Sequence, residues 1–254
     1  MRGLTGRGVL VSGGTSGIGL AAAARFLEEG CRVYITGHEA DQLAAALNEL
    51  AALGDVSGQV GDVADHAQAG AVVAAANEAV GELSILANNA GISWRERFLD
   101  IDVVHWDQII AVNLRGMFSM GQAFARLLVD AGRPGSIVNM ASINALGGEE
   151  DYAHYNASKG GVLALTRSMA VELGQYGIRV NALCPGYIET PLNRQIASAL
   201  DGDFAQRYAQ ERIPLGRIGT PDDVAAAYVF LASDDAAFIH GAALSVDGGQ
   251  LALM

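Results

Sequence analysis

The sequence of 254 residues has few cysteines, few prolines and no long apolar run. Its two cysteines, Cys31 and Cys184, lie at the edges of strand-like runs, so we expect buried thiols and not a disulfide framework. Its five prolines, with no Pro/Ser-rich or charged stretch between apolar segments, leave no candidate for a linker. We therefore predict a single domain that spans residues 1–254.

Positive charge is also scarce, with 16 Lys and Arg residues against 28 Asp and Glu residues and a formal net charge of −12. This balance argues against nucleic acid as a partner, because such binding depends on Lys and Arg neutralising phosphates. The polar residues 1–7 precede only the short run Gly8–Val11, which is too short for a signal peptide core or a membrane span. We predict a cytoplasmic protein with no membrane partner and no metal site.

Short apolar or β-branched runs alternate with longer alanine-rich stretches along the chain. The predicted strands are Gly8–Ser12, Arg32–Thr36, Val56–Val60, Leu83–Ala87, Ser136–Met140, Arg179–Leu183 and Ala243–Val246. The predicted helices between them include Leu20–Glu29, Ala40–Leu53, Ala67–Val80 and Met117–Ala131. Several of these runs, such as Val9–Val11 and Ile137–Val138, are apolar without a period of two, which is typical of strands covered by helices on both faces. The pattern predicts an α/β fold with a doubly wound parallel sheet of about seven strands, whose ligands bind beyond the carboxyl ends of the strands.

A glycine-rich segment, Ser12-Gly13-Gly14-Thr15-Ser16-Gly17-Ile18-Gly19, follows the first predicted strand and opens a helix. Glycine lacks a Cβ, so the backbone can turn tightly at Gly13, approach a pyrophosphate at Gly17 and let helix pack on strand at Gly19. A tight turn of this kind also uses glycine for steric reasons alone, so the segment leaves both interpretations open. Its position after the first strand of an α/β sheet favours nucleotide binding.

Tyr155 and Lys159 lie four residues apart in a predicted helix, and Ser142 lies just beyond the fifth predicted strand. If the helix starts near Tyr152, the intervening loop can bring the Ser142 hydroxyl beside that of Tyr155. One phenol can donate a proton in carbonyl reduction and accept it in alcohol oxidation. Its ordinary pKa of about 10 is too high, and lowering it to near 7 requires roughly 4 kcal/mol. We expect the Lys159 ammonium and a positively charged cofactor bound beside it to supply this stabilisation.

These motifs, in this order, resemble the short-chain dehydrogenase/reductase family, and the resemblance extends from Val9 to Gly249. The glycine-rich turn is similar to the family's T-G-x-x-x-G-x-G motif with Ser12 in place of threonine, and residues 88–91 match its N-N-A-G turn. The resemblance implies a Rossmann-like fold, a homotetramer, and an NAD(P)(H)-dependent oxidoreductase acting on a secondary alcohol or ketone. The catalytic residues that it implies are Asn113, Ser142, Tyr155 and Lys159. By itself, Asn113 is an amide that can simply cap an irregularity in a helix.

The resemblance also implies which residues contact the dinucleotide. They are Gly13, Thr15, Ser16, Gly17, Ile18, Gly19, Gly37, His38, Asp62, Val63, Asn89, Ala90, Gly91, Tyr155, Lys159, Pro185, Gly186, Ile188 and Thr190. Relatives that prefer NAD carry Asp at the position of Gly37, and many that prefer NADP carry Arg at the position of His38. Neither rule is satisfied, and since no acid repels a 2′-phosphate we expect NADP(H) slightly ahead of NAD(H). His38 is either a ligand or an exposed loop residue, and Asp62 either binds adenine or caps the next helix, for which Asp65 is an equally good cap.

The substrate is expected to contact Ser142, Tyr155, Asn144, Tyr187 and Trp94, under a lid formed by residues at about 190–214. Acidic residues at 149–151 disfavour an anionic substrate if they face inward, so we predict a small neutral polyol, sugar or cyclic alcohol. Two alternatives stay open: a reductase of 3-oxoacyl thioesters on an acyl carrier, and a non-catalytic dinucleotide-binding redox sensor. The overall charge mildly disfavours the first, and the presence of Tyr155 with Lys159 argues against the second.

Overall fold

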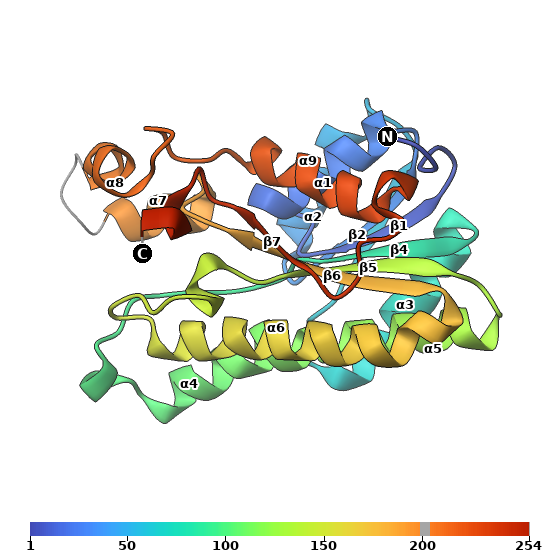
Figure 1. Ribbon diagram of the computed structural model, residues 1–254. Coiled ribbons are helices and arrows are strands. Elements are labelled where there is room, and N and C mark those ends of the chain that lie inside the picture. The colour runs from blue at the N-terminus through green and yellow to red at the C-terminus, as the bar shows by residue number, and fades with distance from the viewer. Residues whose placement is uncertain (199–203, 254) are drawn as a thin grey trace.

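Seven parallel strands form one sheet, in the order β3-β2-β1-β4-β5-β6-β7, in the computed structural model, which describes residues 1–198 and 204–253 (Figure 1). The strands are β1 (Gly8–Ser12), β2 (Arg32–Gly37), β3 (Val56–Val60), β4 (Leu83–Asn88), β5 (Gly135–Met140), β6 (Ile178–Pro185) and β7 (Ala243–Val246). Their bounds differ from the predicted strands by at most two residues, and the predicted doubly wound parallel sheet is confirmed.

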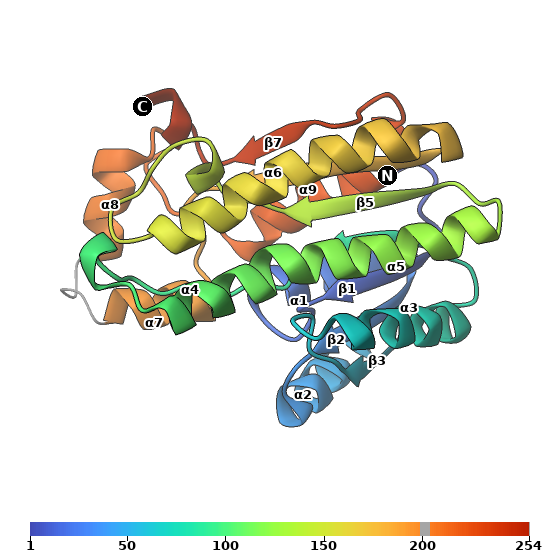
Figure 2. The same cartoon turned by 90° about the horizontal axis from the view of Figure 1, so that it is seen from below.

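Helices cover both faces of this sheet. They are α1 (Gly17–Glu28), α2 (Ala40–Leu50), α3 (His66–Val80), α4 (Val103–Ile110), α5 (Met117–Asp130), α6 (Ala153–Leu173), α7 (Pro191–Ser198), α8 (Phe204–Arg212) and α9 (Pro221–Ala232). Figure 2 shows α3, α4, α5 and α6 on one face, with α1, α2 and α9 behind the sheet on the other. The four helices predicted by residue range are present, with α1 starting earlier and α2 ending earlier than predicted. Within the described ranges, no helix is long and apolar enough to cross a membrane.

The central strands are buried from both sides by these helices. Every residue of β1 and β5 is buried, as the adjacent apolar residues Val9–Val11 and Ile137–Val138 predict. Phe26 and Tyr228 belong to the core cluster on the face of α1 and α9, and Phe124 and Leu128 to the cluster on the face of α5. Full burial of one such side chain contributes about 1.5–3 kcal/mol. This packing fixes the strand ends from which the functional loops start.

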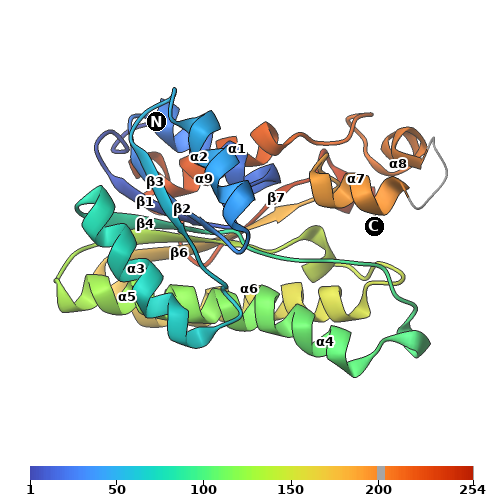
Figure 3. The same ribbon diagram turned by 180° about the vertical axis from the view of Figure 1, so that it is seen from behind.

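The strand order reverses beside β1, whose neighbours are β2 on one side and β4 on the other. In open α/β sheets such a reversal leaves a crevice beyond the carboxyl ends of the strands, where ligands bind. These ends lie on the side of α7, α8 and the C-terminus (Figure 1, Figure 3). We call this side the carboxyl edge of the sheet and the opposite side the amino edge.

Candidate active site

A cavity of about 920 Å³ lies at the carboxyl edge, among the loops that follow the strands. It is lined by most of the predicted site residues, namely Gly13, Thr15, Ser16, Gly17, Ile18, Gly37, His38, Asp62, Val63, Asn89, Ala90, Gly91, Ser142, Asn144, Tyr155, Lys159, Pro185, Gly186, Tyr187, Ile188 and Thr190. Two other predicted residues, Gly19 and Asn113, are buried beside the cavity, and Trp94 packs against neighbouring rings. The structure thus brings the predicted cofactor and catalytic residues into one site.

The loop between β1 and α1 shows the close backbone approaches that its glycines predict. Gly13 and Gly17 have φ angles of 65° and 53°, in the region that favours glycine. A Cβ on Gly19 would lie 2.0 Å from the carbonyl oxygen of Gly13, so a side chain there would displace the turn. Because α1 begins at Gly17, its unpaired N–H groups lie where Ser16, Gly17 and Ile18 line the cavity. A helix start of this kind suits a pyrophosphate.

The hydroxyl of Ser12 joins the two loops that flank the crevice. It donates to Asn88 Oδ1 at 3.3 Å and accepts from the backbone N–H groups of Asn89 at 3.0 Å and Ala90 at 3.2 Å. The Asn89 side chain in turn donates to the carbonyl oxygen of Gly13 at 3.1 Å. Threonine could make the same bonds, which explains why serine at this position keeps the turn intact.

The end of β2 carries no acid where an adenosine ribose would be selected. A Cβ on Gly37 would lie 2.5 Å from Thr15 Cγ2, so an aspartate at this position would require the loop to shift. His38 is exposed, and its Nε2 lies 3.2 Å from Glu39 Oε1. Glu39, which no sequence pattern indicated, adds a negative charge directly beside the residue predicted to meet a 2′-phosphate.

The sequence left two roles open for Asp62, adenine binding and capping of the next helix, and the structure gives the capping role to Asp65. Asp65 is the N-cap of α3, and its carboxylate accepts from the backbone N–H of Ala67 at 2.9 Å. Asp62 lines the cavity, and its Oδ1 accepts from the backbone N–H of Ala64 at 2.8 Å. Asp62 therefore stays available for adenine recognition, which remains a prediction.

Ser142, Tyr155 and Lys159 meet in the wall of this cavity. Ser142 follows β5, and α6 begins at Ala153, so Tyr155 and Lys159 lie one turn apart on the helix. Lys159 Nζ lies 5.5 Å from the centre of the Tyr155 ring and donates to the carbonyl oxygen of Met140 at 2.8 Å. A hydroxyl, a phenol and an ammonium group are thus gathered where a proton can be moved.

Burial dominates the pKa values of the phenol and the ammonium group. It raises the pKa of Tyr155 to about 12, although a hydrogen bond with Ser142 acts in the opposite direction. It lowers the pKa of Lys159, which is 2% exposed, to about 8. The expected pKa near 7 includes the charge of a bound nicotinamide and stays a prediction, and that charge has to overcome the desolvation of the phenolate.

Asn113 lies in a π-helical segment, Ala111–Gly116, between α4 and α5. Its buried amide accepts from the backbone N–H of Ile92 at 2.8 Å and donates to Ile92 O at 2.9 Å and to Ser158 Oγ at 3.2 Å. These bonds join the loop after β4 to α6, beside Lys159. The irregular helix expected at this asparagine is present, and the proton-relay role remains a prediction.

A polar network behind Tyr155 was not predicted from the sequence. One carboxylate oxygen of Glu96 accepts from Trp94 Nε1 at 2.9 Å and lies 3.3 Å from Nε2 of the fully buried His154, and the other lies 2.8 Å from His105 Nδ1. His154 Nδ1 accepts from the backbone N–H of Tyr155 at 2.8 Å, so the ring proton belongs on Nε2, facing Glu96. Trp94 supports this network, which holds the start of α6, and its predicted contact with substrate stays a prediction.

The substrate side of the cavity combines aromatic and polar walls. The rings of Tyr187, Phe204 and Tyr208 lie 5.0 to 6.2 Å apart. Asn144 donates to Glu149 Oε2 at 2.8 Å. Burial and, after it, the negative charge of Glu149 raise the pKa of Tyr187 and Tyr208, which shows that this carboxylate acts on the cavity. The aromatic cluster was not predicted, because only the packing of α8 against the segment after β6 brings Phe204 and Tyr208 to Tyr187.

The predicted lid at about 190–214 corresponds to α7 and α8, and its residues 199–203 lie outside the described residues. Leu192 and Ile196 of α7 and Phe204 and Tyr208 of α8 line the cavity. Tyr208 is held from the C-terminal segment, because Gln250 Nε2 donates to its hydroxyl at 2.6 Å.

Comparisons with known proteins agree with this geometry. The family model described as enoyl-(acyl carrier protein) reductase matches residues 13–250. The L-rhamnose 1-dehydrogenase (NAD(P)(+)) of Sphingomonas sp. strain SKA58 is 43% identical over 252 residues, 98% of each chain. A 3-oxoacyl-[acyl-carrier-protein] reductase of Thermotoga maritima is 36% identical over 247 residues, 97% of this chain and 98% of that one. The crystal structure of a short-chain type dehydrogenase/reductase from Mycobacterium marinum has a TM-score of 0.91 and 32% identity, over 97% of this chain and 96% of that one.

Proposed function

The chain belongs to the short-chain dehydrogenase/reductase family, and we propose that it is an NAD(P)(H)-dependent oxidoreductase that transfers a hydride between nicotinamide and a secondary alcohol or ketone. The family resemblance seen in the sequence is confirmed by these matches. The observation that carries the proposal is the convergence of Ser142, Tyr155 and Lys159 on the cavity that the glycine-rich loop also lines.

The residues at the carboxyl edge fit a dinucleotide. The cradle between Gly13 and Gly19 is one that a Cβ would fill, and a Cβ on Gly91 would lie 3.4 Å from Lys159 Nζ. In our proposal the backbone of the glycine-rich loop binds the pyrophosphate, Asp62 the adenine, and Lys159 the nicotinamide ribose. Residues 185–190 flank the nicotinamide. When bound, the nicotinamide accepts or supplies the hydride.

Tyr155 moves the proton that accompanies hydride transfer. In alcohol oxidation its phenolate accepts the hydroxyl proton of the substrate, and in carbonyl reduction its phenol returns it. Ser142 hydrogen-bonds the substrate oxygen and stabilises the charge that develops there. Since burial alone keeps the Tyr155 pKa at about 12, a positive charge from the bound cofactor and Lys159 is needed to lower it.

We propose a small neutral sugar as the substrate, oxidised at C1. The L-rhamnose 1-dehydrogenases among the relatives support this class. So does the site, because Asn144 and Glu149 offer hydrogen-bonding groups for hydroxyls, and the Glu149 charge repels anions. The aromatic rings of Tyr187, Phe204 and Tyr208 offer an apolar surface for the C–H groups of a sugar ring.

A second candidate is reduction of a 3-oxoacyl thioester on an acyl carrier. It is supported by the description of the matching family model and by the Thermotoga maritima relative. The net charge of −12 and the carboxylate of Glu149 argue against docking of an acidic carrier and its phosphate-linked arm.

The experiment is an absorbance assay at 340 nm with NADP+ and NAD+ against L-rhamnose, other aldoses, polyols and cyclic alcohols, and in reverse with a 3-oxoacyl thioester. We expect turnover of an aldose that Tyr155→Phe abolishes. Glu149→Gln should raise the aldose KM by about tenfold through loss of a charged hydrogen bond, whereas Glu150→Gln should not. Turnover of the thioester alone would establish the second candidate. Dinucleotide binding without turnover across the panel would indicate a redox sensor.

We also propose that residues 1–254 form one catalytic and dinucleotide-binding domain, with α7 and α8 as its substrate lid. A homotetramer is proposed as the assembly. Val103, Val104 and Trp106 of α4, Phe118 of α5 and Val171 of α6 are exposed and apolar, and such a surface favours contact between subunits. Light scattering after size exclusion tests this. The free buried thiols of Cys31 and Cys184 are compatible with the cytoplasmic location that we propose, which cell fractionation tests.

A further inference from the structure

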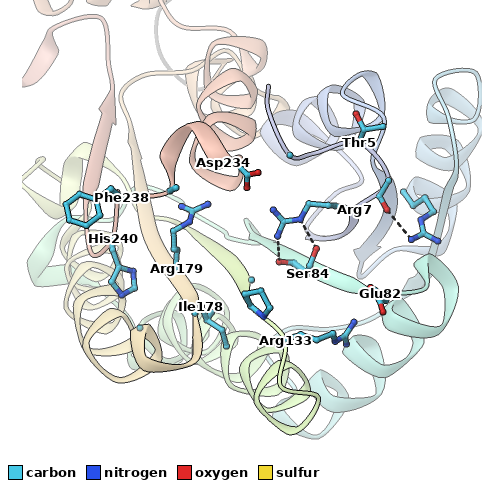
Figure 4. Close-up of a pocket in the computed structure, with 18 residues that line it drawn as sticks. Thr5, Arg7, Glu82, Ser84, Arg133, Ile178, Arg179, Asp234, Phe238 and His240 are labelled. Carbon is cyan, nitrogen blue, oxygen red and sulfur yellow. Dashed lines mark hydrogen bonds between the residues drawn. The ribbon is translucent and has the colours of Figure 1, made fainter.

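A second cavity, of about 1000 Å³, lies at the amino edge of the sheet, at the opposite ends of the strands from Tyr155. Its lining comes from the segments before β1, β4 and β5, from the first residues of β2 and β6, and from the chain between α9 and β7. Figure 4 shows Arg7 and Arg179 reaching into the same hollow from different segments, with Asp234 beside them. Nothing in the proposed oxidoreductase mechanism uses this cavity.

Four arginines, Arg7, Arg32, Arg133 and Arg179, line this one cavity in a chain that has only 16 Lys and Arg residues and a net charge of −12. The two acidic residues in the lining, Glu82 and Asp234, are both exposed. The cavity is therefore a concentration of positive charge on an otherwise acidic protein, which is the electrostatic condition for binding an anion.

Within the described part of the chain, none of these four guanidinium groups forms an ion pair. Arg7 donates to the Ser84 hydroxyl at 3.0 Å, Arg32 to the Gly6 carbonyl oxygen at 3.1 Å, and Arg133 to Asn77 Oδ1 at 3.1 Å. Elsewhere arginines pair with carboxylates, as in the bonds Arg95–Asp151, Arg25–Glu29 and Arg217–Asp223. A half-buried cation without an anionic partner is costly, and an external anion would offset that cost.

Arg179 binds the end of α9, and the other three arginines do not. Its guanidinium donates to the carbonyl oxygens of residues 231, 232 and 233 at the end of α9. The negative end of the α9 dipole therefore stabilises the charge of Arg179. Arg7, Arg32 and Arg133 bind uncharged loop or side-chain groups, and the buried Nε of Arg133 has no hydrogen-bond partner among the described residues.

Arg7 and Arg179 are also partly removed from water, and the charge of Arg7 acts on Arg179. Burial lowers the pKa of Arg7 and of Arg179, and the charge of Arg7 lowers that of Arg179 further. Asp234 raises both, so its carboxylate compensates part of this repulsion from the rim without pairing with either. Positive charge that is partly removed from water and only partly compensated favours capture of an anion with more than one negative charge.

We propose that this amino-edge cavity binds a phosphate group, either free or carried by a small metabolite. Guanidinium groups present N–H donors in a planar fork that matches the oxygens of a phosphate. The cavity is large enough to hold more than the phosphate itself, and the exposed ring of Phe238 stands in its lining as an apolar contact for the rest of a metabolite.

The test is calorimetric titration of the full-length chain with inorganic phosphate, ribose 5-phosphate and ribose, at constant ionic strength set with chloride, with and without saturating NADPH. We expect one phosphate per chain whether or not NADPH is present, and no binding of ribose. Tighter binding of ribose 5-phosphate than of phosphate identifies a phosphorylated metabolite as the ligand, and equal or weaker binding identifies free phosphate.

Arg133→Gln and Arg32→Gln should each weaken phosphate binding by about tenfold or more, since each removes a charged donor. Arg126→Gln, an exposed arginine of α5 outside the cavity, is the matched control and should leave it unchanged. Circular dichroism checks that each variant is folded, and one folded variant of the two is enough for the test. Absence of phosphate binding, loss of the signal on addition of NADPH, or equal affinity in a folded Arg133→Gln and Arg32→Gln chain would overturn the proposal.

Discussion

The carboxyl and amino edges of the sheet present opposite ends of the same helices. At the carboxyl edge α1 begins at Gly17, and its unpaired N–H groups give a positive partial charge without any charged side chain. At the amino edge α9 ends at Ala232, and three carbonyl oxygens there accept hydrogen bonds from Arg179. A parallel sheet wrapped by helices therefore attracts anions with its backbone at one edge and requires cationic side chains at the other.

The buried cations of the two edges also have different effects on stability. Among the described residues, the ammonium group of Lys159 at the carboxyl edge donates to one acceptor, the carbonyl oxygen of Met140, although burial of this charge weakens the fold. The amino edge uses Arg179 to satisfy carbonyl groups that water would otherwise have to reach. Substitution of the buried cation should therefore raise stability at the carboxyl edge and lower it at the amino edge.

Removal of the Tyr155 hydroxyl is expected to have the largest effect. Tyr155→Phe should lower kcat by roughly 10³-fold, within the range that proton transfer by a positioned side chain supplies. The NADPH affinity, measured by fluorescence titration, should stay nearly the same, because the backbone of the glycine-rich loop is proposed to bind the pyrophosphate. Arg126→Gln serves as the control and should keep the wild-type rate. Retained turnover in the phenylalanine variant would show that another group moves the proton.

Lys159→Met should raise the stability of the chain at neutral pH, because it removes the buried ammonium charge that the proposed mechanism uses. Burial lowers the Lys159 pKa from 10.5 to about 8, so between these values the unfolded chain holds a proton that the folded chain lacks. The contribution of this lysine to stability therefore improves as pH rises from about 8 to 10.5, and its penalty is complete below pH 8, at roughly 3 kcal/mol.

Urea unfolding of both chains measures this effect. At about pH 7 the variant should be more stable than the wild type by up to roughly 3 kcal/mol, and the difference should shrink toward zero at about pH 10. The variant should also bind NADPH more weakly at about pH 7, since a charged Lys159 is proposed to hold the ribose. A stability difference that does not change with pH would mean that lost packing, and not charge, separates the two chains.

Arg179→Met should do the opposite at the amino edge. Loss of the bonds to the end of α9 is expected to lower the free energy of unfolding by about 2 kcal/mol, because charged hydrogen bonds contribute about 1.5–3 kcal/mol and methionine keeps part of the packing. Arg126→Met, on an exposed face of α5, should change stability by less than about 0.5 kcal/mol. Equal urea midpoints for the two variants would show that Arg179 is not a structural cap.

The sequence predicted the strands and the main site because each depends on local chemistry. Adjacent apolar residues in a strand require burial on both faces. Gly13 and Gly19 of the β1–α1 loop stand where a Cβ would collide, and Tyr155 and Lys159 share a helix face at a spacing of four. The network of Glu96 with His154 was beyond reach, because it joins residues 58 positions apart through a contact that only the packed loops create. The raised pKa of Tyr155 was missed for a related reason, since burial depends on everything that surrounds the ring.

The choice between NAD and NADP depends on side chains and not on the backbone of the carboxyl edge. Substitutions that change this choice are expected to have the smallest effect. The glycine-rich loop is proposed to bind the pyrophosphate that NAD and NADP share, so the 2′-phosphate would be distinguished by the side chains after β2. His38→Asp should shift the ratio of NADPH to NADH affinity toward NADH by about tenfold, through repulsion of the 2′-phosphate. Glu39→Gln, which removes the acid 3.2 Å from His38, should shift the ratio slightly toward NADPH. Fluorescence titration of both variants with both cofactors measures this, and if neither substitution moves the ratio, the ribose lies away from this loop.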